Sequence, residues 1–193
     1  MTILRPGAAA GEITVQIGTI QAVPGAVGAL PVTLHTDGEA VSGFRNDLLF
    51  EAPIVTVGRD ATHADCTQNP DLLSGDLGAQ FTFPVGCADD TQCVRAAASL
   101  SSETFRAGSV MVYTCAVQVA GAAGPGNYAV RCSNAHTADH EGTLLSASCA
   151  DGAVVVRRTG ADDAQPAVAP DADADARRAW RTGARRRERE RPT

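Results

Sequence analysis

The side chains best suited to chemistry are four histidines: His35, His63, His136 and His140. They do not form the His-x-x-x-His pair of a helical metal site, and the sequence has no G-x-S-x-G nucleophile elbow. Asp89 and Asp90 are adjacent in a predicted turn, which is more typical of solvated carboxylates than of an acid–base pair. The sequence therefore predicts a protein that is not an enzyme.

Metal binding has one weak candidate in "TADHEG" at 137–142, where Asp139 and Glu141 precede a glycine. Oxygen ligands in a loop suit calcium, but the D-x-D-x-D-G spacing is absent, so a polar hairpin loop is favoured. A weaker alternative is a zinc site formed by His63, Cys66 and Cys87. Disulfides account better for those sulfurs, and we expect neither a metal nor a cofactor.

Six cysteines are spread widely through the chain, at Cys66, Cys87, Cys93, Cys115, Cys132 and Cys149. Their even number and the lack of any CxxC pair favour structural disulfides and an oxidising compartment over a zinc ribbon or a thioredoxin-type site. Six cysteines allow about 15 pairings.

Strand alternation suggests part of the connectivity. Cys132 and Cys149 face the core from successive strands of one predicted hairpin, so we expect them to pair. Three pairings remain for the other four cysteines, and we favour Cys66–Cys87 and Cys93–Cys115. Each would close a loop of about 20 residues and contribute about 3 kcal/mol by the chain-entropy model.

Apolar residues alternate with polar ones from residue 12 onward, and turn signals separate the runs. The clearest strand is 109–120, with Met111, Tyr113, Cys115, Val117 and Val119 on one face. Residues 60–78 have no periodicity and are predicted to be a loop held by Cys66. No amphipathic helix is evident. The fold class predicted is all-β, a two-sheet antiparallel β-sandwich of about nine strands.

Composition divides the chain into three parts. The body, 12–158, has 15 Asp and Glu against 7 Arg, a charge of −8 that would repel nucleic acid. The extension 1–11 has no apolar run suited to a secretory signal, so we suspect a truncated start or a piece of a larger protein. The tail 159–193, Ala/Asp/Pro-rich and then Arg-rich, is expected to be disordered; its arginines suggest a solvated segment, an out-of-frame translation or a polyanion-binding tail. No segment is long and apolar enough to span a membrane.

The segment "GFRNDLLF" at 43–50 places Asn46 and Asp47 in the middle of a predicted strand. Alternation puts Asn46 on the face of Phe44, Leu48 and Phe50, where it would be buried and need a hydrogen-bond partner. Asp47 would point the other way, towards water or a partner.

From "ITVQIGTIQAVPGAVGALPVTLHTDGEAVSGFRNDLLFEAP" onward, the chain resembles a cohesin-type module. Later pieces fit the same family: "DCTQNP", "FTFPVGCADDTQCVRA", "SVMVYTCAVQVA", "GPGNYAVRCSNAHTADHEGTLL" and "DGAVVV". The resemblance covers about 12–156 and rests on the succession of pieces. Glu51-Ala52-Pro53 stands where the family favours Asp-Pro, and alanines at 96–98 replace larger apolar residues.

The resemblance implies a nine-stranded jelly roll without catalytic activity that binds dockerin modules in polysaccharide-processing or cell-surface assemblies. It also implies that Asn46 and Asp47 contact the partner, with Arg45 beside them, and that the protein is extracellular or on the cell surface. Because Asn46 is expected to be buried, the outward-facing Arg45, Asp47 and Leu49 are the expected partner-binding residues. A carbohydrate-binding module and a structural surface domain without a ligand remain alternatives. The first is disfavoured because the aromatic residues mostly fall at core-like positions, although polysaccharide binding stays possible.

Overall fold

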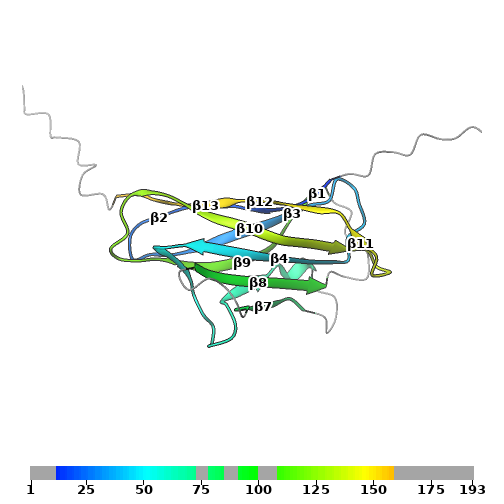
Figure 1. Ribbon diagram of the computed structural model, residues 1–193, viewed down its shortest axis with the longest axis horizontal. Helices are drawn as coiled ribbons and strands as arrows, with labels where there is room; N and C mark the ends of the chain where they lie inside the picture. The colour runs from blue at the N-terminus through cyan, green and yellow to red at the C-terminus, as the bar shows by residue number, and fades with distance from the viewer. Residues whose placement is uncertain (1–11, 73–77, 85–90, 100–107, 159–193) are drawn as a thin grey trace, which may run out of the picture. The chain divides into compact units, whose positions relative to one another are not determined.

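The computed structural model describes residues 12–72, 78–84, 91–99 and 108–158 (Figure 1). Within these ranges the chain is all-β, as predicted, and its two sheets enclose one hydrophobic core. The predicted extension 1–11 and the predicted disordered tail 159–193 lie outside the described residues. The described residues contain no helix with the length and apolar character needed to cross a membrane.

The first sheet contains six strands: β1 (Ile13–Ile17), β3 (Val27–His35), β5 (Ile54–Thr56), β6 (Cys66–Gln68), β9 (Ser109–Val119) and β12 (Ala147–Ala150). Their order is β12-β1-β3-β9-β5, and β6 also pairs with β9. β6 and the short 3-10 helix η1 (Pro70–Leu72) lie in the region predicted to be a loop. Residues 66–68 of that region form a strand because they pair with β9.

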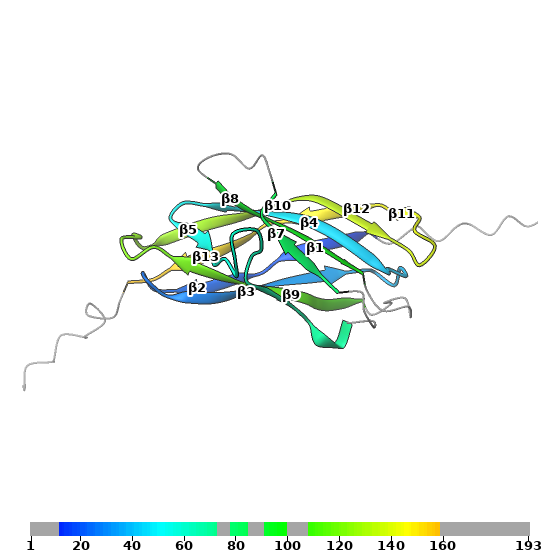
Figure 2. The same ribbon diagram turned by 90° about the horizontal axis from the view of Figure 1, so that it is seen from below.

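The second sheet contains seven strands: β2 (Thr19–Ala22), β4 (Gly43–Glu51), β7 (Gln80–Thr82), β8 (Thr91–Ser99), β10 (Gly126–Ala138), β11 (Leu144–Leu145) and β13 (Gly152–Val156). Their order is β2-β13-β10-β4-β8-β7, and β11 also pairs with β10. β10, β4 and β8 run side by side in Figure 1, and Figure 2 shows β9 in the opposite layer.

Two segments cross from one sheet to the other, which raises the number of strands above the nine expected. β1 continues into β2 at Gly18, and β12 continues into β13 at Asp151. The crossings lie together, since the backbone N–H of Ala153 donates to the Gly18 carbonyl at 3.2 Å. A side chain at Gly152 would collide with that carbonyl and with Ile17.

The crossings also create two parallel pairs, β1–β12 and β2–β13, in sheets that are otherwise antiparallel. The predicted antiparallel sandwich therefore has two parallel pairs as exceptions. The segment β1–β2 and the segment β12–β13 run side by side in the same direction. They are therefore parallel neighbours in the first sheet and again in the second.

Tyr113 lies at the centre of the core, fully buried as predicted. Its ring centroid is 6.0 Å from that of Phe44 and 5.0 Å from that of Phe81. Met111 was predicted on the same inward face, but it is 43% exposed. A register shift between β3 and β9 turns both Val112 and Tyr113 inward, and Met111 therefore points to solvent.

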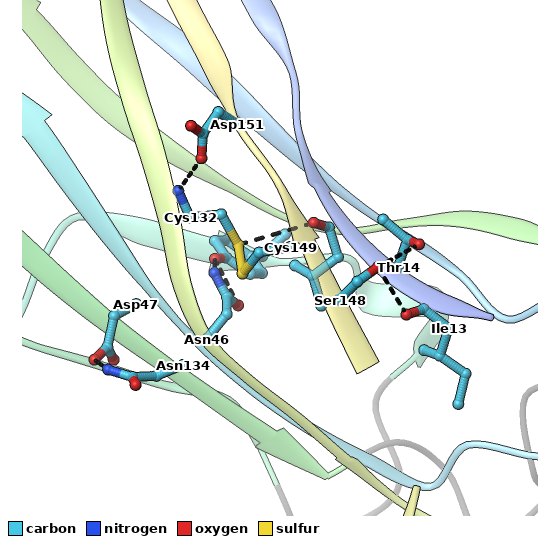
Figure 3. Close-up of a disulfide and its surroundings, with 11 residues drawn as sticks. Ile13, Thr14, Asn46, Asp47, Cys132, Asn134, Ser148, Cys149 and Asp151 are labelled. Carbon is cyan, nitrogen blue, oxygen red and sulfur yellow. Dashed lines mark hydrogen bonds between the residues drawn. A yellow bond between two sulfur atoms is a disulfide. The ribbon is translucent and has the colours of Figure 1, made fainter. Parts of the chain in front are cut away.

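The disulfide Cys132–Cys149 forms as predicted, but not within a hairpin (Figure 3). Cys132 lies in β10 of the second sheet and Cys149 in β12 of the first, so the bond joins the two sheets. Close by, the Asp151 carboxylate accepts a hydrogen bond from the backbone N–H of Cys132 at 2.7 Å.

The other two predicted pairings are wrong, because Cys66 bonds to Cys115. These two residues lie directly opposite each other on β6 and β9. The register of the strands therefore determines which cysteines form the disulfide, and the length of the loop between them does not. Cys93 also takes part in a disulfide, and Cys87 lies outside the described residues.

Candidate functional site

The polar residues in the middle of β4 have two separate environments. Asn46 is completely buried and points toward β9 of the opposite sheet, as the alternation predicted. Its side-chain amide donates to the Tyr113 hydroxyl at 2.9 Å, and that hydroxyl donates to the Asn46 carbonyl oxygen at 3.1 Å. Burial raises the pKa of Tyr113 well above its ordinary value. The pair satisfies its polar groups inside the core, so Asn46 is a structural residue.

Asp47 points to the outer side of the second sheet, but it doesn't face open water. Its side chain is only 7% exposed. Arg95, its cross-strand partner on β8, donates from Nε and Nη2 to the two carboxylate oxygens, both at 2.8 Å. The Asn134 amide donates to the same carboxylate at 2.7 Å from the other side (Figure 3). Asp47 thus lies on the outward face that alternation predicted, and side chains from β8 and β10, rather than water, surround its carboxylate.

These hydrogen bonds fix the charge of Asp47. The pKa of Asp47 is held below its ordinary value mainly by the hydrogen bonds from Arg95. The hydrogen bond from Asn134 lowers it further. Burial opposes both effects. Asp47 consequently remains ionised at neutral pH and anchors the guanidinium of Arg95 on the sheet surface.

Asn134 reaches Asp47 because β10 is irregular at this point. The β4–β10 register shifts between Ser133 and His136, and Asn134 has a φ of 52°. Asparagine tolerates this left-handed conformation better than most residues. The bulge thus redirects one short amide side chain onto the outer surface, next to Asp47.

We call the outward side of β4, β8 and β10 the arginine face, defined by Arg45, Asp47, Leu49, Arg95, Arg131 and His136. The strand register places these residues together: Arg45 is opposite His136, and Leu49 is opposite Arg131. Arg45, Arg131 and His136 are exposed and Leu49 is half-buried. The structure therefore brings together all three site residues implied by the resemblance and adds Arg95, Arg131 and His136.

A shallow groove of about 440 Å³ lies at one end of this face. Arg45 and His136 line it together with the small side chains of Ala97 and Ser99. Leu144 of β11 forms part of its wall and is 74% exposed. The groove could accept a side chain from another molecule, since it offers the apolar side chain of Leu144 and the guanidinium of Arg45.

The weaker candidates from the sequence have local structural roles. Asp139 accepts backbone hydrogen bonds from Glu141 and Thr143 at 2.9 and 2.8 Å, which stabilises the hairpin loop and lowers the pKa of Asp139. Asp60 caps the turn at Thr62 and His63 in a similar way. No cluster of potential metal ligands occurs among the described residues. Asp89 and Asp90 lie outside the described ranges.

Solved structures with a similar fold are cohesins. One is a chain from a type I cohesin–dockerin complex of Clostridium thermocellum, with 15% identity, a TM-score of 0.60 and coverage of 76% of this chain and 100% of that one. Another is the sixth cohesin of scaffoldin B from Acetivibrio cellulolyticus, in complex with a dockerin, with 14% identity, a TM-score of 0.58 and coverage of 76% and 100%.

A third similar structure is a non-cellulosomal cohesin from the archaeon Archaeoglobus fulgidus, with 12% identity, a TM-score of 0.57 and coverage of 76% and 92%. No protein-family model matches the sequence, and no curated protein sequence matches it. The chain thus has a cohesin-like fold that includes nearly the full length of each of these solved chains.

Proposed function

We propose that the protein is a non-catalytic, extracellular interaction module whose arginine face binds a dockerin-type protein partner. The observation that carries the proposal is the cohesin-like fold, shared with chains that were solved in complexes with dockerins. The disulfides Cys66–Cys115 and Cys132–Cys149 support an oxidising location, outside the cell or at its surface.

The arginine face suits a protein partner. Asp47, Arg95 and Asn134 hold one another in a fixed arrangement, so little side-chain conformational entropy is lost there on binding. Arg45 and Leu49 lie beside this rigid centre on β4, and they combine a charged with an apolar contact. A preorganised polar centre next to a shallow groove is a favourable surface for a folded module.

A carbohydrate-binding function has less support. Stacking on a sugar ring requires an exposed aromatic side chain, and the exposed large hydrophobic residues of the described chain are Val23, Val27, Met111 and Leu144. Tyr113 is buried in the core. Tyr128 is partly buried and its hydroxyl donates to the Gly124 carbonyl at 2.8 Å.

The test is a binding assay between the immobilised full chain and each dockerin-type module, with duplicated calcium-loop segments, encoded by the source organism. Calcium and a chelator are compared for each module. We expect at least one module to bind with a Kd below about 1 μM. If no module binds in either condition, the proposed function is wrong.

Two variants locate the binding surface. Leu49→Asp introduces a charge on the arginine face and should weaken binding at least about tenfold, or about 1.4 kcal/mol. Met111→Asp is the matched control, because Met111 is an exposed apolar residue of the first sheet. Equal losses in both variants would place the binding surface elsewhere.

A further inference from the structure

The charge of the arginine face is opposite to that of the protein body. Three arginines, Arg45, Arg95 and Arg131, surround one carboxylate, that of Asp47. With three positive charges and one negative charge, this surface has a formal charge of +2, whereas residues 12–158 as a whole carry −8. Such a local reversal shapes the electrostatic field that an approaching molecule meets.

Arg95 keeps donors available after it binds Asp47. A guanidinium has about five N–H donors, and the bonds to Asp47 occupy one on Nε and one on Nη2. Nη1 makes no contact with Asp47, and the side chain is 37% exposed. Arg95 is therefore a cation held in position, with a free edge that can bind a carboxylate.

Arg45 and Arg131 have no salt bridge among the described residues. Both are exposed, and they flank Asp47 from β4 and β10. Their guanidinium groups are thus available for a partner, unlike that of Arg59, which lies 3.6 Å from the carboxylate of Asp65.

One further carboxylate belongs to the same side of β4. Glu51 is exposed at the end of the strand, two residues beyond Leu49, so alternation places it on the outward face. Counting Glu51, three positive and two negative charges still leave a formal charge of +1 on this surface.

We propose that the arginine face selects a partner whose contact surface presents carboxylates, bound by Arg45, Arg95 and Arg131. This inference rests on the proposed function, since it specifies the partner of the same surface. Arginine forms bidentate bonds with carboxylates, and the preset orientation of Arg95 favours that geometry. A basic partner would meet unpaired cations here, which would disfavour it at this surface.

The experiment is a selection with the full chain as bait and a displayed two-helix scaffold, randomised at its surface positions, as probe. The same library is selected against the double variant Arg45→Gln/Arg131→Gln. Neither of these two exposed arginines forms a salt bridge within the described part of the chain, and a melting curve checks that the variant folds. Arg59→Gln is the control for loss of an arginine elsewhere.

We expect clones enriched in Asp and Glu that lose at least about tenfold in affinity for the double variant and keep affinity for Arg59→Gln. Their binding should also weaken between about 50 and 500 mM NaCl. Clones enriched in Lys and Arg, clones without a charge bias, or no enrichment would overturn the inference. Acidic clones that bind the double variant equally well would also overturn it, because their binding would then not depend on Arg45 and Arg131.

These outcomes are distinct from failure of the proposed function, which the dockerin panel tests separately. A dockerin-type module that binds wild type and the double variant equally would support the function and contradict the acidic-partner inference. Selection of acidic clones, when no dockerin-type module binds, would support the acidic-partner inference and contradict the proposed function.

Discussion

Asn46 and Tyr113 exchange two hydrogen bonds across the sandwich, at 2.9 and 3.1 Å, and both side chains are completely buried. The pair joins β4, which carries the arginine face on its other side, to β9 of the opposite sheet. The position of the proposed binding strand is therefore fixed from within the core.

Tyr113→Phe should destabilise the protein by about 1–3 kcal/mol, because the buried Asn46 amide loses its partner. The measurement is chemical unfolding. Tyr128→Phe is the control and should cost less than about 1 kcal/mol, since its hydroxyl bonds a carbonyl in an exposed setting. In the double variant Asn46→Leu/Tyr113→Phe, the loss should be smaller than the sum of the single losses. Additive losses would contradict the coupling.

Alkaline pH should destabilise the protein through Tyr113. Burial raises the pKa of Tyr113 in the folded state above its value of 10.0 in the unfolded chain. The stabilisation is complete below the unfolded pKa and is lost as the pH rises above it towards the folded pKa. The chain has no lysine to obscure this effect. Unfolding measured from about pH 9 to 11 should show a decline that is reduced in Tyr113→Phe; equal declines would contradict the assignment.

Acid should weaken the bond network of Asp47. The folded pKa of Asp47 is lowered from 3.8, so its stabilisation is present above the unfolded pKa and is lost as the pH falls through the folded one. Asp47→Asn should be less stable than wild type at pH 7 by about 1–3 kcal/mol. The difference should shrink in melting curves recorded below about pH 4. Asp71→Asn, at an exposed position, serves as control. A constant difference at all pH values would refute the mechanism.

Peptide mapping should find Cys66 joined to Cys115. Cleavage after Arg and before Asp separates these cysteines from the others, leaving Cys66 in 65–70 and Cys115 in 107–131. The non-reduced digest should contain these two peptides as one disulfide-linked species. The bond closes about 50 residues and should contribute about 4 kcal/mol, which denaturation of Cys66→Ser/Cys115→Ser can measure. A link from Cys115 to the peptide 90–95, which contains Cys93, would contradict the register of β6.

The strand pattern was sufficient to predict the fold class and the burial of Asn46, because alternation assigns each side chain to one face. It could not predict that Asp47 is covered, since Arg95 and Asn134 are 48 and 87 residues away in the sequence. Met111 was misplaced because a register shift depends on the neighbouring strand. Cys66 was mispaired because a short strand in an aperiodic region joins β9.

The sheet crossings at Gly18 and Gly152 were also beyond the sequence pattern. Alternation continues through the segment at Gly18, and Asp151-Gly152 is typical of a turn, so neither position indicated a strand that crosses between sheets. The contact between these glycine positions becomes visible only when two segments more than 130 residues apart lie together.

Hydroxyl-radical footprinting of the full chain with a bound dockerin-type module tests the central claim most directly. The account predicts that Leu49 and His136, on the arginine face, lose labelling when the module binds. Met111, exposed on the first sheet, should keep its labelling. Protection of Met111 with unchanged labelling of Leu49 and His136 would contradict the assignment of the binding surface.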